Sequence, residues 1–259
     1  MRSKKIAITN EKGGCAKTTT AVNLSATLAE KGYKTLLVDM DYQSYASHYL
    51  DRYNEDNPGI FEVLKGYDIR AVVQSTDFNN LFILPATISF ISGEEWLISE
   101  KNNGSGYLSI VENALSPISE DYDYIIIDCP PNGIFLKEAI QKYADFLVLP
   151  TVPDDYAVHS LLCKASEMMK IKASVNPHLE ILGILIVMFE KNRNKIAYTN
   201  ALKEQEMFPC FDTVIRKNTT LSEAINAKLP IVHYNKRSNG AVDYKAFTDE
   251  IISKTQGGK

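Results

Sequence analysis

The sequence predicts an α/β fold with a doubly wound, mostly parallel sheet and helices on both faces. Three observations lead to this prediction. Short β-branched runs alternate with longer segments of helical spacing along the 259 residues, as in repeated βαβ units. Several of the short runs, such as residues 125–127 and 184–187, are apolar throughout, which is typical of strands that helices cover on both sides. A glycine-containing turn at residues 10–16 separates the first strand from the first helix.

Most of the expected strands are short apolar runs that stop at an aspartate, a threonine or a proline. The uninterrupted apolar runs are expected at the centre of the sheet. In chain order, the expected strands are residues 5–9, 35–39, 81–85, 124–128, 146–150 and 181–188.

Helices are expected where apolar residues recur every three or four positions, most clearly over residues 18–31. The loop signals at Pro58-Gly59 and at residues 102–106 are too short to separate domains, so we expect a single domain over residues 1–259 with a frayed tail at 255–259. In chain order, the expected helices are residues 18–31, 108–115, 136–143, 157–174, 197–205 and 244–253.

Composition excludes several classes of protein. With 45% apolar and 23% charged residues the chain reads as soluble and globular. Its longest apolar stretches, about seven residues, fall far short of the ~20 that cross a bilayer, and the N-terminus lacks a secretory signal, which favours a cytoplasmic address. Four cysteines without a C-x-x-C pair indicate neither a disulfide framework nor a zinc site: Cys15, Cys129, Cys163 and Cys210.

Charge is unevenly distributed along the chain. Residues 191–259 hold 12 basic and 7 acidic side chains, whereas residues 1–190 hold 16 basic and 25 acidic ones. The C-terminal part is therefore basic although the whole chain carries a net charge of −4. This asymmetry is compatible with an anionic partner on one face, and equally with a solvated face.

The turn at residues 10–20 predicts a phosphate site. A strand that ends in a glycine turn and opens a helix directs several backbone N–H groups and the helix dipole at one point. Lys17 is then expected to reach the terminal phosphates, and the Thr18 hydroxyl to hold Mg²⁺. The ordinary pattern G-x-x-x-x-G-K-[ST] is not met, because Glu11 and Ala16 occupy its two glycine positions.

The string K-G-G-C-A-K-T-T resembles the deviant Walker A box of the ParA/MinD family of ATPases. Lys12 matches the family's signature lysine, which contacts the phosphates of the neighbouring subunit in a nucleotide-sandwich homodimer. The resemblance thus implies catalytic roles for Lys12, Lys17 and Asp41. It implies that ATP is bound by Lys12, Gly13, Gly14, Cys15, Ala16, Lys17, Thr18 and Thr19.

Two further segments resemble this family. Residues 35–43 are similar to its D-x-D-P-Q switch with Tyr42 in place of proline, and residues 124–131 resemble its Walker B strand. By this resemblance Asp41 positions the attacking water, Asp39 supports it and Asp128 bonds the Mg²⁺ shell. Carboxylates at the carboxyl ends of parallel strands converge near the first βα loop. The expected metal set is Thr18, Asp39, Asp41 and Asp128.

The C-terminal region is similar to that of ParA-type relatives, with departures at Arg216, Lys217 and Thr220. The resemblance places Met188, Ile215 and Arg216 near the base. Basic side chains are expected to neutralise duplex phosphates without reading bases. The expected DNA-binding residues are Lys191, Arg193, Lys195, Arg216, Lys217, Lys228, Lys236 and Arg237.

Two positions in the loop are unusual. A thiol near a helix N-terminus, as at Cys15, can have a lowered pKa, although the residue is equally explained as a small side chain that fits. Ala16 replaces a glycine, and we expect helical dihedral angles there, which alanine tolerates.

The leading hypothesis is a DNA-partitioning ATPase that most resembles the ParA/Soj type without an N-terminal helix-turn-helix domain. ATP would close a homodimer on nonspecific duplex DNA at the nucleoid, and a ParB-like activator would stimulate slow hydrolysis and release. The alternative is a MinD-like positioning ATPase, but residues 247–254 lack the basic amphipathic character of a membrane helix, so no membrane contact is expected. An electron-transfer ATPase lacks support because no cysteine lies between residues 16 and 128. A binding module without catalysis stays open.

Overall fold

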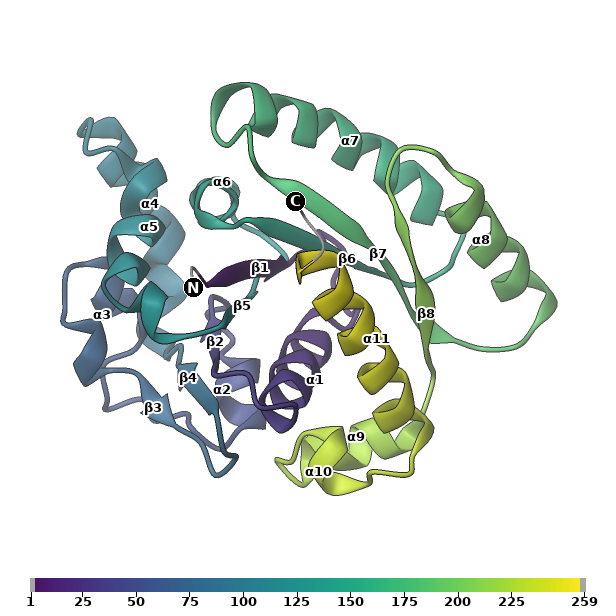
Figure 1. Ribbon diagram of the computed structural model, residues 1–259. Helices are drawn as coiled ribbons and strands as arrows, with labels where there is room; N and C mark the ends of the chain where they lie inside the picture. The colour runs from purple at the N-terminus through teal and green to yellow at the C-terminus, as the bar shows by residue number, and fades with distance from the viewer. Residues whose placement is uncertain (1–2, 257–259) are drawn as a thin grey trace.

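A computed structural model describes residues 3–256, apart from the side chains of residues 158–163 and 165. It shows an eight-stranded sheet in the order β3-β4-β2-β5-β1-β6-β7-β8, with helices packed on both faces (Figure 1). All pairings are parallel except that of β3 with β4. The predicted doubly wound fold is confirmed. The strands are β1 (Lys4–Ile8), β2 (Thr35–Asp39), β3 (Gln74–Ser75), β4 (Leu81–Leu84), β5 (Tyr124–Asp128), β6 (Phe146–Thr151), β7 (Glu180–Phe189) and β8 (Cys210–Arg216).

The helices follow the strands in the alternation that the sequence predicts. They vary from single turns to the 18-residue α7 and α11. They are α1 (Lys17–Glu30), α2 (Tyr45–Tyr49), α3 (Ile60–Leu64), α4 (Gly93–Asn102), α5 (Ile110–Leu115), α6 (Ile134–Tyr143), α7 (Ala157–Ser174), α8 (Arg193–Glu204), α9 (Thr219–Asn226), α10 (Ile231–Tyr234) and α11 (Asn239–Gln256), with 3₁₀ turns at Ile69–Ala71, Ile88–Ser92, Tyr107–Ser109 and Ser116–Asp121.

Alternate residues of the central strands enter separate cores on the two faces of the sheet, and a third, smaller core lies beside β6 and β7. Ile126 of β5 packs with α1, α2, α10 and α11, whereas its neighbours Ile125 and Ile127 pack with α3 to α7. A strand with both faces covered must be apolar at every position, which explains the uninterrupted run in the sequence. Figure 1 shows α1 and α11 on one side of the sheet and α4 to α6 on the other.

Some expected elements differ from the structure. Strands β3 and β8 and helices α2, α3, α4, α9 and α10 were not expected, because they are short or carry weak apolar periodicity. The expectation of a frayed tail is wrong for its first two residues: α11 continues to Gln256, and the buried Thr255 hydroxyl lies 3.1 Å from the Tyr124 hydroxyl. Residues 257–259 lie outside the described part of the chain.

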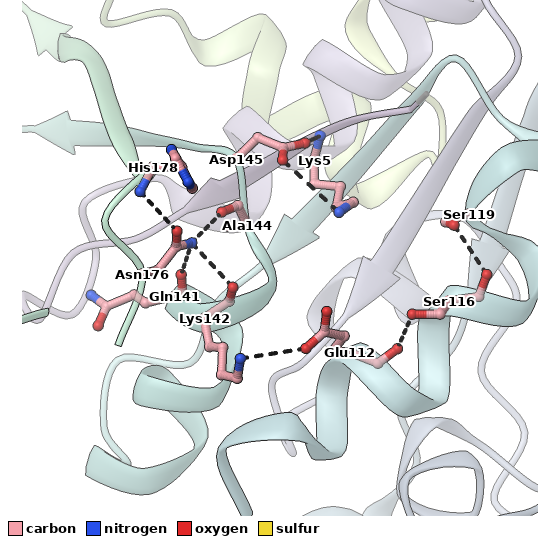
Figure 2. A network of polar contacts seen from close by, with 10 residues as sticks. All are labelled: Lys5, Glu112, Ser116, Ser119, Gln141, Lys142, Ala144, Asp145, Asn176 and His178. Carbon is pink, nitrogen blue, oxygen red and sulfur yellow. Dashed lines mark hydrogen bonds and ion pairs between the residues drawn. The ribbon is translucent and has the colours of Figure 1, made fainter. Parts of the chain in front are cut away.

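The amino ends of the central strands are closed by polar contacts (Figure 2). The Asn176 amide donates to the carbonyl oxygens of Gln141, Lys142 and Ala144 at 2.9 to 3.1 Å, and so satisfies the C-terminal end of α6. The backbone N–H of Lys5 donates to the Asp145 carboxylate at 3.0 Å. This edge of the molecule therefore uses its polar groups for its own structure.

The outer strand β8 is protected by carboxylates of α11. The backbone N–H groups of Asp212 and Thr213 donate to Glu250 at 2.9 and 2.7 Å, and that of Arg216 donates to Asp243 at 2.9 Å. Edge-strand N–H groups that are occupied in this way do not offer themselves to another chain. Over residues 3–256 the structure contains no helix that combines the length and the apolar character needed to span a bilayer.

Candidate functional site

The turn between β1 and α1 is built from two residues in the left-handed region. Gly14 has φ 71°, and Ala16 has φ 60° and ψ 31°. The expectation of helical dihedral angles at Ala16 is therefore wrong. A Cβ in this region costs roughly 1 kcal/mol relative to glycine, so the chain holds a mildly strained turn where a glycine is the usual residue. A Cβ added at Gly13 or Gly14 would meet no heavy atom within 4 Å, which shows that space is open above the turn.

The turn opens into a cavity of about 590 Å³ at the N-terminus of α1. The preceding residue, Ala16, has no side chain able to cap the first amides of this helix, so these N–H groups are available to an anion. The lining consists of the turn itself, one aspartate, and residues from α2 and from the end of α9. These are Gly13, Gly14, Cys15, Ala16, Lys17, Thr18, Thr19, Asp41, Gln43, Tyr45, His48, Tyr49, Pro131, Met188, Ile225, Asn226 and Lys228.

The two lysines of the loop have different environments. Lys17 is only 7% exposed, and its Nζ lies 3.3 Å from the carbonyl oxygen of Lys12, beside the floor of the cavity. The side chain of Lys12 is 45% exposed and forms an ion pair with Asp154, in the turn between β6 and α7. The structure therefore brings Lys17 to the predicted site and holds Lys12 outside the cavity of its own chain.

Asp39 and Asp128 end adjacent strands and are paired in register, as the sequence predicts. Asp39 is hydrogen-bonded: one oxygen accepts from the Asp41 N–H at 3.1 Å and the other from the Ser47 N–H and hydroxyl at 2.9 and 2.7 Å. Burial raises the pKa of Asp39 to about 6, and the charge of Asp41 adds to this shift. Asp39 is thus an anchor for the segment that leads into α2.

The fully buried Asp128 differs from Asp39, because neither of its carboxylate oxygens has a hydrogen-bond partner at normal geometry within the described part of the chain. Burial, followed by the charge of Asp39, raises its pKa well above the usual value. The Thr18 hydroxyl and the charge of Lys17 lie near enough to oppose this rise in its pKa. A buried carboxyl group of this kind is either protonated or balanced by a bound cation. Asp128 therefore fits a divalent cation placed between it and the phosphate loop.

The remaining candidates for a metal are Thr18 and Asp41, which both line the cavity. Burial raises the pKa of Asp41, while the Gln43 N–H and the charge of Lys17 lower it. The side chains that the structure describes contain no cluster of three His, Cys, Asp or Glu residues suited to hold a metal alone. This composition matches Mg²⁺, which retains waters and takes phosphate oxygens as ligands.

Cys15 is a packing residue in this structure. Its thiol is buried and donates to the carbonyl oxygen of Lys12 at 3.0 Å. Burial raises the pKa of the Cys15 thiol, so the lowered value that a helix N-terminus can produce is not found. Cys129 and Cys210 are also free thiols, and the side chain of Cys163 lies outside the described set.

The residues expected near the base separate into two groups. Met188 lines the cavity, whereas Ile215 is buried elsewhere and Arg216 forms a bidentate pair with Asp243, with a shortest distance of 2.6 Å. The lining contributed by α2 and by the end of α9 was missed in the sequence. The only signal for the α2 part of this lining is that α2 directly follows the Asp41 segment. Helix α2 has five residues, too few to show a helical period of apolar residues.

The expected DNA-binding residues are mostly engaged within the chain. Lys217 pairs with Glu190 at 3.0 Å, Lys236 with Glu30 at 3.3 Å, and Lys228 with Asp51 beside the cavity. Lys195 donates to the carbonyl oxygen of Pro153 at 2.8 Å. Among the described side chains, the exposed ones of this set without an ion pair or hydrogen bond are Lys191, Arg193 and Arg237.

Three features together define a nucleotide-binding protein of the P-loop class. They are a mostly parallel sheet, a left-handed turn after its central strand β1, and the Asp128 carboxylate at the end of β5, which lies beside β1 in the sheet. A family model described as an AAA domain matches residues 3–181. The chromosome partitioning protein ParA of Myxococcus xanthus (strain DK1622) is 34% identical over 254 residues, which cover 96% of this chain and 88% of that protein. The sporulation initiation inhibitor protein Soj of Bacillus subtilis (strain 168) is also 34% identical, covering 96% of this chain and 98% of the relative.

The fold is equally well matched among solved structures. Cobyrinic acid a,c-diamide synthase from Mycobacterium smegmatis, with bound ATP analogue and magnesium, superposes with a TM-score of 0.86 at 25% identity, over 99% of this chain and 97% of that one. The chain belongs to the ParA-type family of partitioning ATPases within the P-loop class.

Proposed function

We propose that this chain is an ATP-hydrolysing molecular switch of the DNA-partitioning type, formed by one ATPase domain. The observation that carries the proposal is the cavity at the N-terminus of α1, with Lys17 at its floor and the unpaired Asp128 behind it. An anionic ligand with an associated divalent cation satisfies both features at once. A nucleoside triphosphate with Mg²⁺ is such a ligand.

Each loop residue then has a defined task. The backbone of residues 13–19 binds the phosphates, Lys17 neutralises their charge, and the Thr18 hydroxyl and Asp128 would hold the cation, Asp128 through water. Bound Mg²⁺ supplies charge stabilisation at the β- and γ-phosphate oxygens. Asp41, at the cavity wall, orients the attacking water, and Asp39 fixes the backbone of Asp41 by its hydrogen bond.

Dimerisation requires Lys12 to change partner. In the free chain it is paired with Asp154 and is kept out of its own cavity. In a closed pair of subunits we expect Lys12 to leave Asp154 and to reach the phosphates bound by the other subunit. Hydrolysis by a single subunit is then slow, because one cation of the site is missing.

Duplex DNA is the proposed binding partner. Three exposed cations without ion-pair partners, Lys191, Arg193 and Arg237, are available to phosphates, and closure of two subunits doubles their number. Helix α11 favours DNA rather than a membrane as the partner. Its apolar side chains Tyr244, Phe247 and Ile251 are buried in the core and are therefore not available to insert into a lipid surface. A ParB-like partner would stimulate hydrolysis and end DNA binding at the nucleoid.

The experiment is DNA retardation by the purified chain with ADP, ATP or a non-hydrolysable ATP analogue, together with steady-state ATP turnover. We expect retardation only with the triphosphate forms, and its loss in Lys17→Gln and Lys12→Ala. Lys17→Gln should fail to bind nucleotide, whereas Lys12→Ala should bind nucleotide as a monomer. DNA binding that is equal with ADP and ATP, or equal in both variants, would refute the switch.

A further inference from the structure

The phosphate loop contains one charged side chain, Glu11, that the proposed function leaves unexplained. Glu11 directly precedes Lys12, and its carboxylate accepts from the Nζ of Lys137 at 2.9 Å. Glu11 is 61% exposed, and Gly13, which lines the cavity, is two residues away. A negative charge therefore lies two residues along the chain from the wall of a cavity suited to an anion, although neither Glu11 nor Lys137 lines that cavity itself.

Lys137 has an unusual position for a cation. It belongs to the first turn of α6, where the helix dipole is positive and disfavours a positive side chain. Its side chain is only 14% exposed. Both circumstances are unfavourable for an ammonium group, so its placement requires compensation. Glu11 is the direct ion-pair partner of Lys137, and the charge of Lys137 also lowers the pKa of Glu167.

The backbone that carries Lys137 is held firmly. The Glu94 carboxylate of α4 accepts from the N–H groups of Phe135 at 3.0 Å and Leu136 at 3.4 Å, and thereby caps α6. Gly133 enters the helix with φ 103°, and a Cβ there would lie 3.0 Å from Glu94. Because its helix is fixed at this end, Lys137 is directed to one position beside the loop.

We propose that Lys137 is a positioning residue for the nucleoside triphosphate, which acts by neutralising Glu11. With Lys137 present, the approaching phosphates meet a neutral ion pair next to the part of the loop that lines the cavity. Without it, they meet an uncompensated carboxylate. This inference rests on the proposed function, since it concerns the affinity of the same cavity for ATP.

Neutralisation predicts an asymmetry between the two partners. Lys137→Gln should raise the Kd for ATP about tenfold, the order expected for one extra charge near a triphosphate. Glu11→Gln should leave the Kd unchanged or lower it, because it removes the repelling group. The double variant Glu11→Gln with Lys137→Gln should restore wild-type affinity. A pair that served only to hold the loop in shape would give similar losses in both single variants.

The test measures the Kd of a fluorescent ATP analogue with Mg²⁺ at low and high salt, with thermal unfolding to confirm that each variant folds. Lys142→Gln is the matched control: it lies in the last turn of the same helix and pairs with Glu112 at 3.5 Å (Figure 2). Lys137→Arg should retain affinity, and the loss in Lys137→Gln should shrink at high salt.

Two results would overturn the inference: a Kd for Lys137→Gln equal to that of the wild type, or equal weakening in Lys137→Gln and Glu11→Gln. A wild-type chain and a Lys142→Gln chain that both fail to bind the analogue would instead refute the proposed function. The two failures are therefore distinguishable.

Discussion

The two edges of the central sheet treat their polar groups differently. At the amino edge, Asn176 and Asp145 satisfy the end of α6 and the start of β1 with contacts internal to the chain (Figure 2). At the carboxyl edge, Asp128 is buried with both oxygens unsatisfied by the described residues, and the first amides of α1 face an open cavity. Folding alone explains the first arrangement. The second leaves polar groups that a bound ligand could satisfy, and this difference distinguishes structural polar groups from candidate functional ones.

The largest expected effect comes from removing the charge at the carboxyl edge. Asp128→Asn should lower ATP turnover roughly 10- to 100-fold, because the cation loses its support. The same change should raise the thermal midpoint of the nucleotide-free protein, since a buried, uncompensated charge disappears. Turnover assays and calorimetry on one preparation test both effects. A variant that is less stable than the wild type without ligand would contradict the assignment of Asp128 as a ligand-dependent group.

The reciprocal change at the amino edge should affect stability alone. Asn176→Ala removes the donor to three carbonyl oxygens at the end of α6, and we expect a loss of about 2 kcal/mol in the free energy of unfolding. Urea unfolding measures the loss. The Kd for the ATP analogue should stay within about twofold of the wild-type value at a temperature where the variant is folded. A large change in affinity would show that the two edges are not independent.

The pH dependence of stability should reveal the carboxyl edge directly. The pKa of Asp39 is raised by burial from its ordinary value of 3.8 to about 6, so the folded state binds more protons than the unfolded state between these values. The free energy of unfolding contributed by this group therefore falls as the pH rises through the window, by at most about 1.4 kcal/mol per pH unit. Urea titrations at pH 4, 5 and 6 without nucleotide should show this slope, and Asp39→Asn should reduce it to the part contributed by Asp41 and Asp128, whose pKa values burial also raises. An unchanged slope in that variant would assign the dependence to other groups.

The smallest expected effect concerns the turn itself. Ala16→Gly relieves a left-handed alanine and should stabilise the protein by up to about 1 kcal/mol, without loss of affinity for nucleotide. Thermal unfolding and analogue binding provide the measurement. Weaker binding in Ala16→Gly would indicate that the rigid alanine preorganises the turn.

The sequence predicts the centre of the molecule better than its surroundings. The runs at residues 35–39 and 124–128 are strands with those same bounds, because a strand buried on both faces leaves an unmistakable apolar signature. The phosphate turn can be predicted from the sequence because its glycines and lysines lie within a few residues of one another. The partners of Lys12, Glu11 and Arg216 are not readable, since Asp154, Lys137 and Asp243 are distant in sequence and only the fold brings them close.

Short elements escape prediction for a different reason. Helix α2 has only five residues, too few to show the helical period of about 3.6 residues. In β8 the apolar and polar residues do not alternate strictly, so the period of two typical of a strand is missing. Helix α2 nevertheless contributes Tyr45 and Tyr49 to the wall of the cavity. The residues of α2 that line this cavity thus lie in a segment whose local sequence gives no clear secondary-structure signal.

The capped strand β8 has a consequence for how copies of this chain can associate. At one margin of the sheet Glu250 and Asp243 occupy the outward amides, and at the other β3 has only two residues. Neither margin is a template on which further strands could be added, so growth into open-ended fibres is blocked on both sides. An association between copies of this chain would therefore use surfaces other than the margins of the sheet.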